Sequence, residues 1–534
     1  MKTILFAGLL AVATAQSSDL ASEGKAWWAH VQVLADDALE GRNAGTPGYD
    51  KAVDYVEGQF KAIGLKPAGT SGFRQPVKFD NRLLAPGKTS LALVRDGKEE
   101  PLAVGQDATL NARGELDGSL EAGLVFVGYG LSIPDAGWDD LAGQDLRGKI
   151  AVYVNAFPPI TVSDNVRSHA NTADERWAAA KRAGAIGIAS VGVPPATPAP
   201  AGRGGGGGGQ GGGTPAPVVT LSDRDVQNLS GQKVAMSFTQ TGAAKLFEGT
   251  DHTLAAIGQL VRDNQPLPRF AFPGTLKAQA ALTRDVWESS NVAGLFEGSD
   301  PTLKSEVVVM TAHLDHVGVG RAVNGDAIFN GAMDDASGVA AMLEIARLLK
   351  ASKAATKRSI LFVAVTAEEK GLLGSRYFAA HPTVPFEKIV GDINLDMFLP
   401  LFPLKVIEVQ GLAESSLGES VRAAAKSLGV EVQTDREPAQ NRFIRSDQYS
   451  FIRRGVPALA FKFGYEFGSP DEKTRLDWVA NRYHQPSDDV TQPVNLEAAA
   501  LFNRVIRTLL QRVADDTARP SWNADSFFRR FATR

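Results

Sequence analysis

Five short groups of histidines and acidic residues lie at or near the ends of apolar runs in the second half of the chain. In chain order they are His313 with Asp315, Asp334 with Asp335, Glu368 with Glu369, Asp396, and His484. Imidazole nitrogens and carboxylate oxygens are ligands that zinc accepts, and the chain has no cysteine that could supply a thiolate. Gathered in one place, these groups could hold two metal ions and leave one carboxylate free as a base. That combination is suited to hydrolysis.

The pair Glu368-Glu369 has an unusual setting for surface charge. It follows the strongly apolar run 360–367 and precedes Gly371-Leu-Leu-Gly374. Two adjacent carboxylates crowded at the end of a strand repel one another unless a cation lies between them. The pair therefore favours a cation site over a solvated surface.

The elements that must position these groups have an α/β pattern. Short apolar runs predict strands at 307–312, 360–367, 389–395 and 456–463, of the kind that helices cover on both faces. Apolar residues at helical spacing predict a helix at 339–349, and 414–428 is a second helix candidate. We therefore expect an α/β fold with a mixed, mostly parallel sheet and helices on both faces. Ligands bind beyond the carboxyl ends of such strands, so one rim should collect all five groups.

Length and composition indicate more than one domain. The chain has 534 residues, and its formal net charge of -4 and lack of charge blocks argue against nucleic acid as a partner. Residues 49–65 have helical periodicity, whereas short β-like runs dominate from about 100 to 265, with one helix at 173–182. We predict a main domain formed by 16–100 and 266–534, and a β-rich insert at 101–265.

The nearly all-glycine stretch 201–213 lies inside the predicted insert. It lacks the Gly-Lys-Ser/Thr ending of a phosphate-binding loop and opens no helix. We predict a flexible surface loop there.

The first fifteen residues have the composition of a signal peptide. Lys2 precedes an apolar run at 4–12, and Ala13-Thr14-Ala15 forms a small-residue cleavage site. The run is too short to span a bilayer, and no second membrane segment appears in the sequence. We expect cleavage near Ala15 and export to the periplasm or the medium. Without cysteine, an exported protein must rely on its core and not on disulfides.

As a set, the motifs resemble those of a known enzyme family. They are the segments 312–318 (AHLDHVG), 330–338 (NGAMDDASG), 367–375 (AEEKGLLGS), 394–396 (NLD) and 483–484 (YH). They are similar to the two-zinc aminopeptidases of the aminopeptidase Y and bacterial leucyl aminopeptidase type, which share the zinc exopeptidase (phosphorylase/hydrolase-like) fold with the glutamate carboxypeptidases. The insert resembles their protease-associated domain at 127–130, 145–150 and 180–188. Residues 39–46 also look like the N-terminal segment of that family.

The resemblance implies a role for each residue. Two zinc ions (Zn2+) would be bridged by Asp334, and Glu368 would stay off the metals as the general base. The terminal ligands would be His313, Glu369, Asp396 and His484. A base adjacent to a ligand can reach the water between the ions, and burial would raise its pKa towards neutrality. The family set does not use His316, and we leave it out.

Four further residues are expected around the ligands. Asp315 and Asp488 are placed to accept the second imidazole N–H of His313 and His484. Asp335 is expected to support the ligands without binding metal, and the resemblance implies a cis peptide bond at Asp334-Asp335. Tyr483 could donate its hydroxyl to an oxyanion, and a purely packing role is an equal alternative.

The leading hypothesis is an exported aminopeptidase that acts on peptides with a free N-terminus. The water that bridges the two zinc ions would attack the first peptide carbonyl while Glu368 takes its proton. A carboxypeptidase of the same fold is the first alternative, and it would need a basic pocket, for which Arg442 and Arg445 are candidates. A non-catalytic, receptor-like module is the second alternative, against which the complete ligand set and base argue.

Overall fold

The computed structural model describes residues 3–85, 87–193, 217–227 and 229–532. The chain forms two compact units, of which the first comprises Met1–Val77 and Glu288–Arg534 and the second Lys78–Trp287. Strands β2 (Arg74–Leu84) and β14 (Leu282–Phe296) carry the chain across this division. The predicted glycine-rich loop 201–213 lies outside the described residues.

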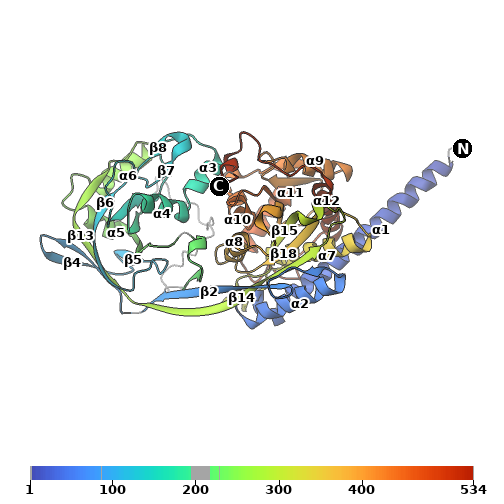
Figure 1. Cartoon of the computed structure of the whole chain (residues 1–534), viewed down its shortest axis with the longest axis horizontal. Helices are drawn as coiled ribbons and strands as arrows, with labels where there is room; N and C mark the ends of the chain where they lie inside the picture. Colours follow the sequence, from blue (N-terminus) through green and yellow to red (C-terminus); the bar gives the residue numbers. More distant parts are fainter. Residues whose placement is uncertain (1–2, 86, 194–216, 228, 533–534) are drawn as a thin grey trace. The chain divides into compact units, whose positions relative to one another are not determined.

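A parallel four-stranded core forms the centre of the first unit (Figure 1). Its strands run in the order β18, β15, β19 and β22, which are Ser359–Val365, Val307–His313, Ile389–Leu395 and Ala458–Phe463. On one side, β14 pairs antiparallel with β18, and β2 follows β14. On the other side, β20 (Val406–Gln410) pairs antiparallel with β22 and parallel with β21 (Glu431–Thr434). The sheet is therefore mixed and mostly parallel around the predicted site.

Helices cover both faces of this sheet. Val308, Met310 and Ala312 of β15 face one apolar core, whereas Val307 and Val309 face another. On the first face lie α1 (Thr3–Leu34), α2 (Pro47–Ile63), α7 (Ser337–Ala351), α9 (Leu417–Ser427) and α12 (Leu496–Asp515). On the other lie α8 (Leu373–Ala380) and α10 (Gln448–Ile452), which are labelled in Figure 1. Their residues Phe378 and Phe451 are fully buried. The expected fold class is confirmed.

Most elements predicted from periodicity are found with small shifts at their ends. The strand expected at 389–395 is β19 itself, and the helix expected at 173–182 is α4 (Ala173–Arg182). The strand expected at 360–367 is too long, because β18 ends at Val365 and Ala367 has a positive φ of 55°. This turn matters because it places Glu368 and Glu369 beyond the sheet.

Several smaller elements complete the first unit. They are η1 (Asp37–Arg42), β1 (Lys66–Pro67), η4 (Leu303–Ser305), β16 (Gly318–Val323), β17 (Asp326–Phe329), the π-helical turn η5 (Ala332–Ala336), η6 (Phe386–Lys388), η7 (Pro438–Gln440), η8 (Arg442–Ile444), α11 (Pro470–Asn481) and η9 (Phe527–Phe531). Helix α1 continues past the expected cleavage site near Ala15, and its residues Trp27, Val31 and Leu34 are buried in the core. Within the described residues, no helix is long and apolar enough to cross a membrane.

The second unit is built on an eight-stranded sheet of its own. The strand order is β4 (Lys98–Leu102), β3 (Ser90–Arg95), β13 (Phe270–Ala280), β6 (Gly118–Phe126), β9 (Ile150–Val154), β10 (Gly187–Val191), β12 (Val234–Phe238) and β5 (Ala108–Leu110). The expected insert boundaries at 101 and 265 lie inside this unit, because β3, β4 and β13 belong to the same sheet.

Short helices and strands fill out the second unit. Helices α5 (Gln240–Phe247) and α6 (Leu254–Arg262) pack on one face of its sheet, and α4 packs on the other. The remaining elements are β7 (Ser132–Ile133), η2 (Pro134–Ala136), β8 (Trp138–Asp139), α3 (Asp164–Ala170), β11 (Val218–Leu221) and η3 (Asp225–Gln227).

Candidate metal centre

The five predicted groups do meet at the carboxyl ends of the parallel strands. His313 is the last residue of β15, Asp396 directly follows β19, and Glu369 lies in the turn after β18. Asp334 belongs to η5, just before α7, and His484 follows α11 with a positive φ of 53°. Parallel strands direct their carboxyl ends to one edge, so segments far apart in sequence contribute to one place.

One side of the centre is formed by His313, Asp334 and Asp396. Nε2 of His313 lies 3.1 Å from Oδ1 of Asp334 and 3.9 Å from Oδ1 of Asp396. The three residues offer ligand atoms that all lie close enough together to bind one metal ion. Oδ1 of Asp396 is buried and has no hydrogen-bond partner among the described residues. An unpartnered buried carboxylate oxygen is costly unless a cation binds it.

The other side is formed by Asp334, Glu369 and His484. Nε2 of His484 lies 3.1 Å from Oδ2 of Asp334 and 3.2 Å from Oε2 of Glu369. Zinc bound tetrahedrally at about 2.0–2.1 Å places its ligand atoms about 3.3 Å apart, so these separations fit the ion. Asp334 presents one carboxylate oxygen to each side, which is the arrangement that a bridging ligand requires.

Nearby carboxylates raise the pKa values of the two histidines of the centre, His313 and His484. Burial lowers the pKa of His484, but the carboxylates of Asp334 and Glu369 outweigh it and raise this pKa to about 10. His313 behaves in the same way, because Glu368, Asp334 and Asp335 raise its pKa well above the ordinary value despite burial. The centre therefore attracts positive charge strongly, which a metal ion would satisfy in place of protons.

Glu368 lies outside both groups of candidate ligands. Its side chain is half-buried, and removal from water raises the pKa of its carboxyl well above the ordinary value. His313 opposes this pKa shift, whereas Glu369 and Asp447 add to it. A carboxylate next to the ligands, with a raised pKa and no metal to bind, has the properties of a general base.

Asp315 does not hold His313 in the way that its spacing predicts. Nδ1 of His313 lies 3.0 Å from the backbone oxygen of Asp315, not from its carboxylate. The carboxylate instead accepts hydrogen bonds from the backbone N–H groups of Glu368 and Glu369, at 3.0 and 3.3 Å. Asp315 thus fixes the turn that carries the base, because two adjacent N–H groups at the strand end need an acceptor.

Asp488 also differs from its expected role. Its carboxylate accepts hydrogen bonds from the backbone N–H groups of Met333 and Asp334, at 2.9 and 3.1 Å, and from Gln492 at 2.6 Å. The expected hydrogen bond to His484 is not among the contacts of the described residues. Asp488 therefore holds the loop of the bridging residue.

Asp335 supports the centre without joining either group of candidate ligands. Its Oδ1 accepts hydrogen bonds from the backbone N–H groups of Gly338 and Met397, at 3.0 and 3.1 Å. It therefore links the segment of Asp334 to the segment of Asp396. The peptide bond Asp334-Asp335 is cis, as the resemblance implied.

Tyr483 packs directly against a candidate ligand. Its ring stacks on His484 with centroids 4.0 Å apart, and it borders an apolar cluster that contains Met333 and Trp478. Burial, followed by the charges of Asp334 and Glu369, raises the pKa of its hydroxyl. The tyrosine therefore stays protonated, as a hydrogen-bond donor must, and its donation to an oxyanion stays a prediction.

His316, which the resemblance does not include, lies beside these candidate ligands. It is fully buried, and its Nδ1 lies 2.9 Å from Oε1 of Glu369 and 3.9 Å from Oδ2 of Asp334. With Asp334, Glu369 and His484 it forms a second, four-residue group of candidate ligands. The family motif does not use His316 as a ligand. Its position three residues after His313 is the sequence feature that could have indicated it.

Two other charged residues near the centre, Asp447 and Lys462, are not indicated by any motif in the sequence. Asp447 is fully buried, and burial raises its pKa to about 7. Lys462 donates a hydrogen bond to the backbone oxygen of Asp396, and its Nζ lies 3.7 Å from Oδ1 of that residue. A lone buried lysine in a strand cannot be assigned from spacing, because its partner comes from another strand.

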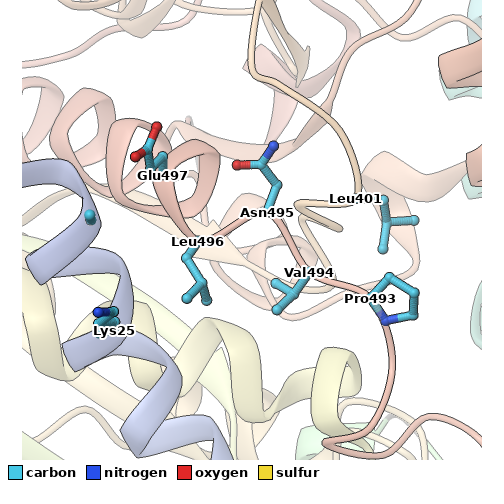
Figure 2. A pocket seen from close by; sticks show the side chains of 8 residues that line it. Lys25, Leu401, Pro493, Val494, Asn495, Leu496 and Glu497 are labelled. Atoms are coloured by element: carbon cyan, nitrogen blue, oxygen red, sulfur yellow. The ribbon is translucent and has the colours of Figure 1, made fainter. Parts of the chain in front are cut away.

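A separate surface pocket lies where α1 meets the start of α12 (Figure 2). Its described lining residues are Ala21, Lys25, Leu401, Pro493, Val494, Asn495, Leu496 and Glu497. None of them is a candidate ligand or base. The pocket therefore shares no described lining residue with the candidate metal centre.

Comparisons with known proteins agree with this geometry. Residues 291–510 match the family model described as peptidase family M28. A probable leucine aminopeptidase 2 of Aspergillus oryzae is 28% identical over 299 residues, which are 52% of this chain and 56% of that protein. A probable zinc metalloprotease of Pyricularia oryzae is 34% identical over 229 residues, 41% of this chain and 44% of that protein. The chain thus spans about half the length of these curated relatives.

Among solved structures, an aminopeptidase from Aneurinibacillus sp. strain AM-1 is similar over 95% of this chain and all of that one. The TM-score is 0.50 and the identity is 20%, which supports the fold. The matched segment 291–510 contains every candidate ligand and the candidate base.

Proposed function

We propose that the chain is an exported two-zinc aminopeptidase. The observation that carries the proposal is the position of Asp334, whose two carboxylate oxygens each lie 3.1 Å from a different histidine of the centre. Two divalent ions held close together need such a shared carboxylate to offset their repulsion. When bound, the ions would acidify a shared water and polarise the scissile carbonyl.

The residues of the chain divide the remaining work. Glu368 would take a proton from the attacking water and deliver it to the leaving amine, for which its raised pKa is suited. The carboxylate of Asp315 holds Glu368 in place by accepting a hydrogen bond from the backbone N–H of Glu368. Tyr483 would donate its hydroxyl to the oxygen of the tetrahedral intermediate.

The charge of the centre favours an aminopeptidase over a carboxypeptidase. Carboxylates surround the candidate metal positions, and they would attract the α-ammonium group of a free N-terminus. Arg442, a candidate for binding a substrate carboxylate, is instead paired with acids of the chain. Its Nη2 lies 2.5 Å from Glu437 and its Nη1 lies 3.8 Å from Asp435. The leucine aminopeptidase name of the Aspergillus relative supports the same choice.

The other candidate cation is also occupied. Arg445 donates through Nη1 to the backbone oxygen of Gln440 at 3.3 Å. A pocket for a C-terminal glutamate would need guanidinium groups that are free to pair with two carboxylates. These contacts therefore speak against acidic carboxypeptidase specificity.

The location of the protein and the identity of its insert belong to the same proposal. The signal-like residues 1–15 support export with cleavage near Ala15. The resemblance at 127–130 and 145–150 supports a protease-associated domain within the unit Lys78–Trp287. Secretion of the chain, followed by N-terminal sequencing of the secreted form, tests the first of these statements.

A substrate panel tests the activity. We expect hydrolysis of leucine anilide, no hydrolysis of the N-acetylated compound, and no release of glutamate from N-acetylated peptides that end in it. Glu368→Gln protein, purified in parallel, shows how much activity comes from contaminating peptidases. Preference for blocked amines, or release of C-terminal glutamate, would contradict the proposal.

A further inference from the structure

Arg42 is a fully buried cation beside the metal centre. It is the last residue of η1 and has a positive φ of 49°. The preceding Gly41 lies so close to the backbone of β17 that a Cβ there would be 2.3 Å from the oxygen of Phe329. Glycine at position 41 permits this close approach, and the backbone conformation of Arg42 places its guanidinium inside the protein.

The guanidinium binds the backbone of both segments that carry metal ligands. Nε donates to the oxygen of Leu314 at 3.0 Å, and Leu314 lies between His313 and Asp315. Nη1 donates to Asn330 at 2.6 Å and Nη2 to Gly331 at 3.0 Å, just before the turn of Asp334. Arg42 also accepts a hydrogen bond from the backbone N–H of His316 at 3.2 Å. One side chain therefore sets the spacing between the segment of His313 and that of Asp334.

Arg42 also opposes the negative charge of the centre. Burial lowers its pKa to about 10, and the carboxylates of Asp488, Asp315, Asp335 and Asp334 counter this effect, so it stays charged at neutral pH. Its side-chain hydrogen bonds within the described residues all go to backbone oxygens, with Leu34 as the fourth acceptor. The cation therefore offsets the repulsion among the acids without occupying the oxygens that would bind metal.

We propose that Arg42 is a positioning residue for the metal centre, a role that rests on the proposed function. It fixes the separation of the two ligand segments through hydrogen bonds to the backbone of both. A lysine cannot replace it, because a single ammonium group cannot reach carbonyls on two segments with the geometry of a planar fork.

The chain offers a matched control in Arg358. This arginine is also fully buried, and it pairs with Glu306 at 2.7 Å and donates to the backbone oxygens of Val513 and Thr517 at 3.2 and 3.3 Å. Arg358 and its partner Glu306 lie at the amino ends of β18 and β15, the ends opposite to those that carry the candidate ligands. Replacement of either arginine by lysine should destabilise the fold, so the two variants separate loss of stability from loss of metal binding.

The test measures zinc affinity by competition with a chromophoric chelator on the folded full-length chain. We expect Arg42→Lys to bind zinc about 10–100-fold more weakly than wild type, the usual effect of removing an outer support of a metal site. Arg358→Lys should keep wild-type affinity although its melting temperature falls. If Arg42→Lys does not fold, Arg42→Gln, which keeps amide donors but no charge, must show the same selective loss.

Equal zinc affinity in the Arg42 variants and the wild type would overturn the positioning role. So would an equal loss in Arg358→Lys, because it would trace the effect to general destabilisation. A wild-type chain that binds no zinc at all would instead overturn the proposed function. The two failures are therefore distinct.

Discussion

The buried acids of the candidate metal centre and three buried acids of the second unit have different partners. In the unit Lys78–Trp287, Asp80 lies 2.7 Å from Arg82, Asp107 lies 2.8 Å from Lys245, and Asp174 lies 2.6 Å from Arg113. In the candidate metal centre, Glu369 faces His316 and His484 at 2.9 and 3.2 Å, and Oδ1 of Asp396 has no hydrogen-bond partner among the described residues. There, Arg42 and Lys462 give their hydrogen bonds to backbone oxygens instead.

This difference separates a structural acid from a functional one. A buried carboxylate costs free energy unless it is paired, so a fold that needs only stability pairs it with Lys or Arg. In the candidate metal centre, Arg42 and Lys462 donate to backbone oxygens, and the carboxylate of Glu369 faces histidines. This arrangement favours the binding of a small divalent cation. Asp80, Asp107 and Asp174 of the second unit are already paired with Lys or Arg and do not need such a cation.

Metal removal should give the largest contrast between the units. Chelation should abolish activity and destabilise only the unit around β15, by about 4 kcal/mol relative to a zinc concentration 1,000-fold above its dissociation constant. Hydrogen exchange read segment by segment would check this, with β9 and β10 of the second unit as the internal control. Equal loss of protection in both units would contradict the contrast.

Glu368→Gln should have the next largest effect on activity. The amide cannot accept the proton of the attacking water, so kcat should fall about 10²- to 10⁴-fold. Zinc content should not change, because Glu368 lies outside both groups of candidate ligands. Measured zinc loss would mean that Glu368 and Glu369 have exchanged roles.

Asp488→Asn should weaken the centre without removing a ligand. The carboxylate accepts hydrogen bonds from two backbone N–H groups of the Asp334 loop, and an amide nitrogen there would face donors. Zinc affinity should fall about 10–100-fold, which equilibrium dialysis can measure. Unchanged affinity would show that the loop of Asp334 holds its position without Asp488.

Lys245→Met should leave the catalytic constants unchanged and give the smallest effect. It removes the cation 2.8 Å from Asp107 in the second unit, so the melting temperature should fall by a few degrees. Activity and calorimetry on the same preparation would check both statements. A fall in kcat/KM would imply that the paired acids of this unit also serve the reaction.

The sequence predicts the rim well because apolar runs and strand ends are local signals. β19 agrees with its predicted bounds, and His313, Glu369 and Asp396 lie at strand ends as expected. The partners of Asp315 and Asp488 could not be predicted, because both bind backbone N–H groups whose positions depend on tertiary turns. The insert boundaries at 101 and 265 fell inside the second unit for a similar reason, since strand pairing joins distant segments.

His316 and Arg42 show a different limit. Each lies in a motif that the sequence made visible, but spacing alone does not say which way a side chain points. The role of His316 depends on the position of Glu369, which lies elsewhere in the sequence. The role of Arg42 depends on backbone oxygens from three separate segments. Side chains that bind main-chain atoms leave no pattern in the residue types of their partners.

The most direct test of the account is the location of bound zinc. Anomalous diffraction at the zinc edge, combined with metal analysis of the same protein, should find two zinc ions per chain. One should lie between His313, Asp334 and Asp396, the other between Asp334, Glu369 and His484, and none in the unit Lys78–Trp287. A single ion, or any pair of ions that does not share Asp334, would contradict the proposed two-zinc centre.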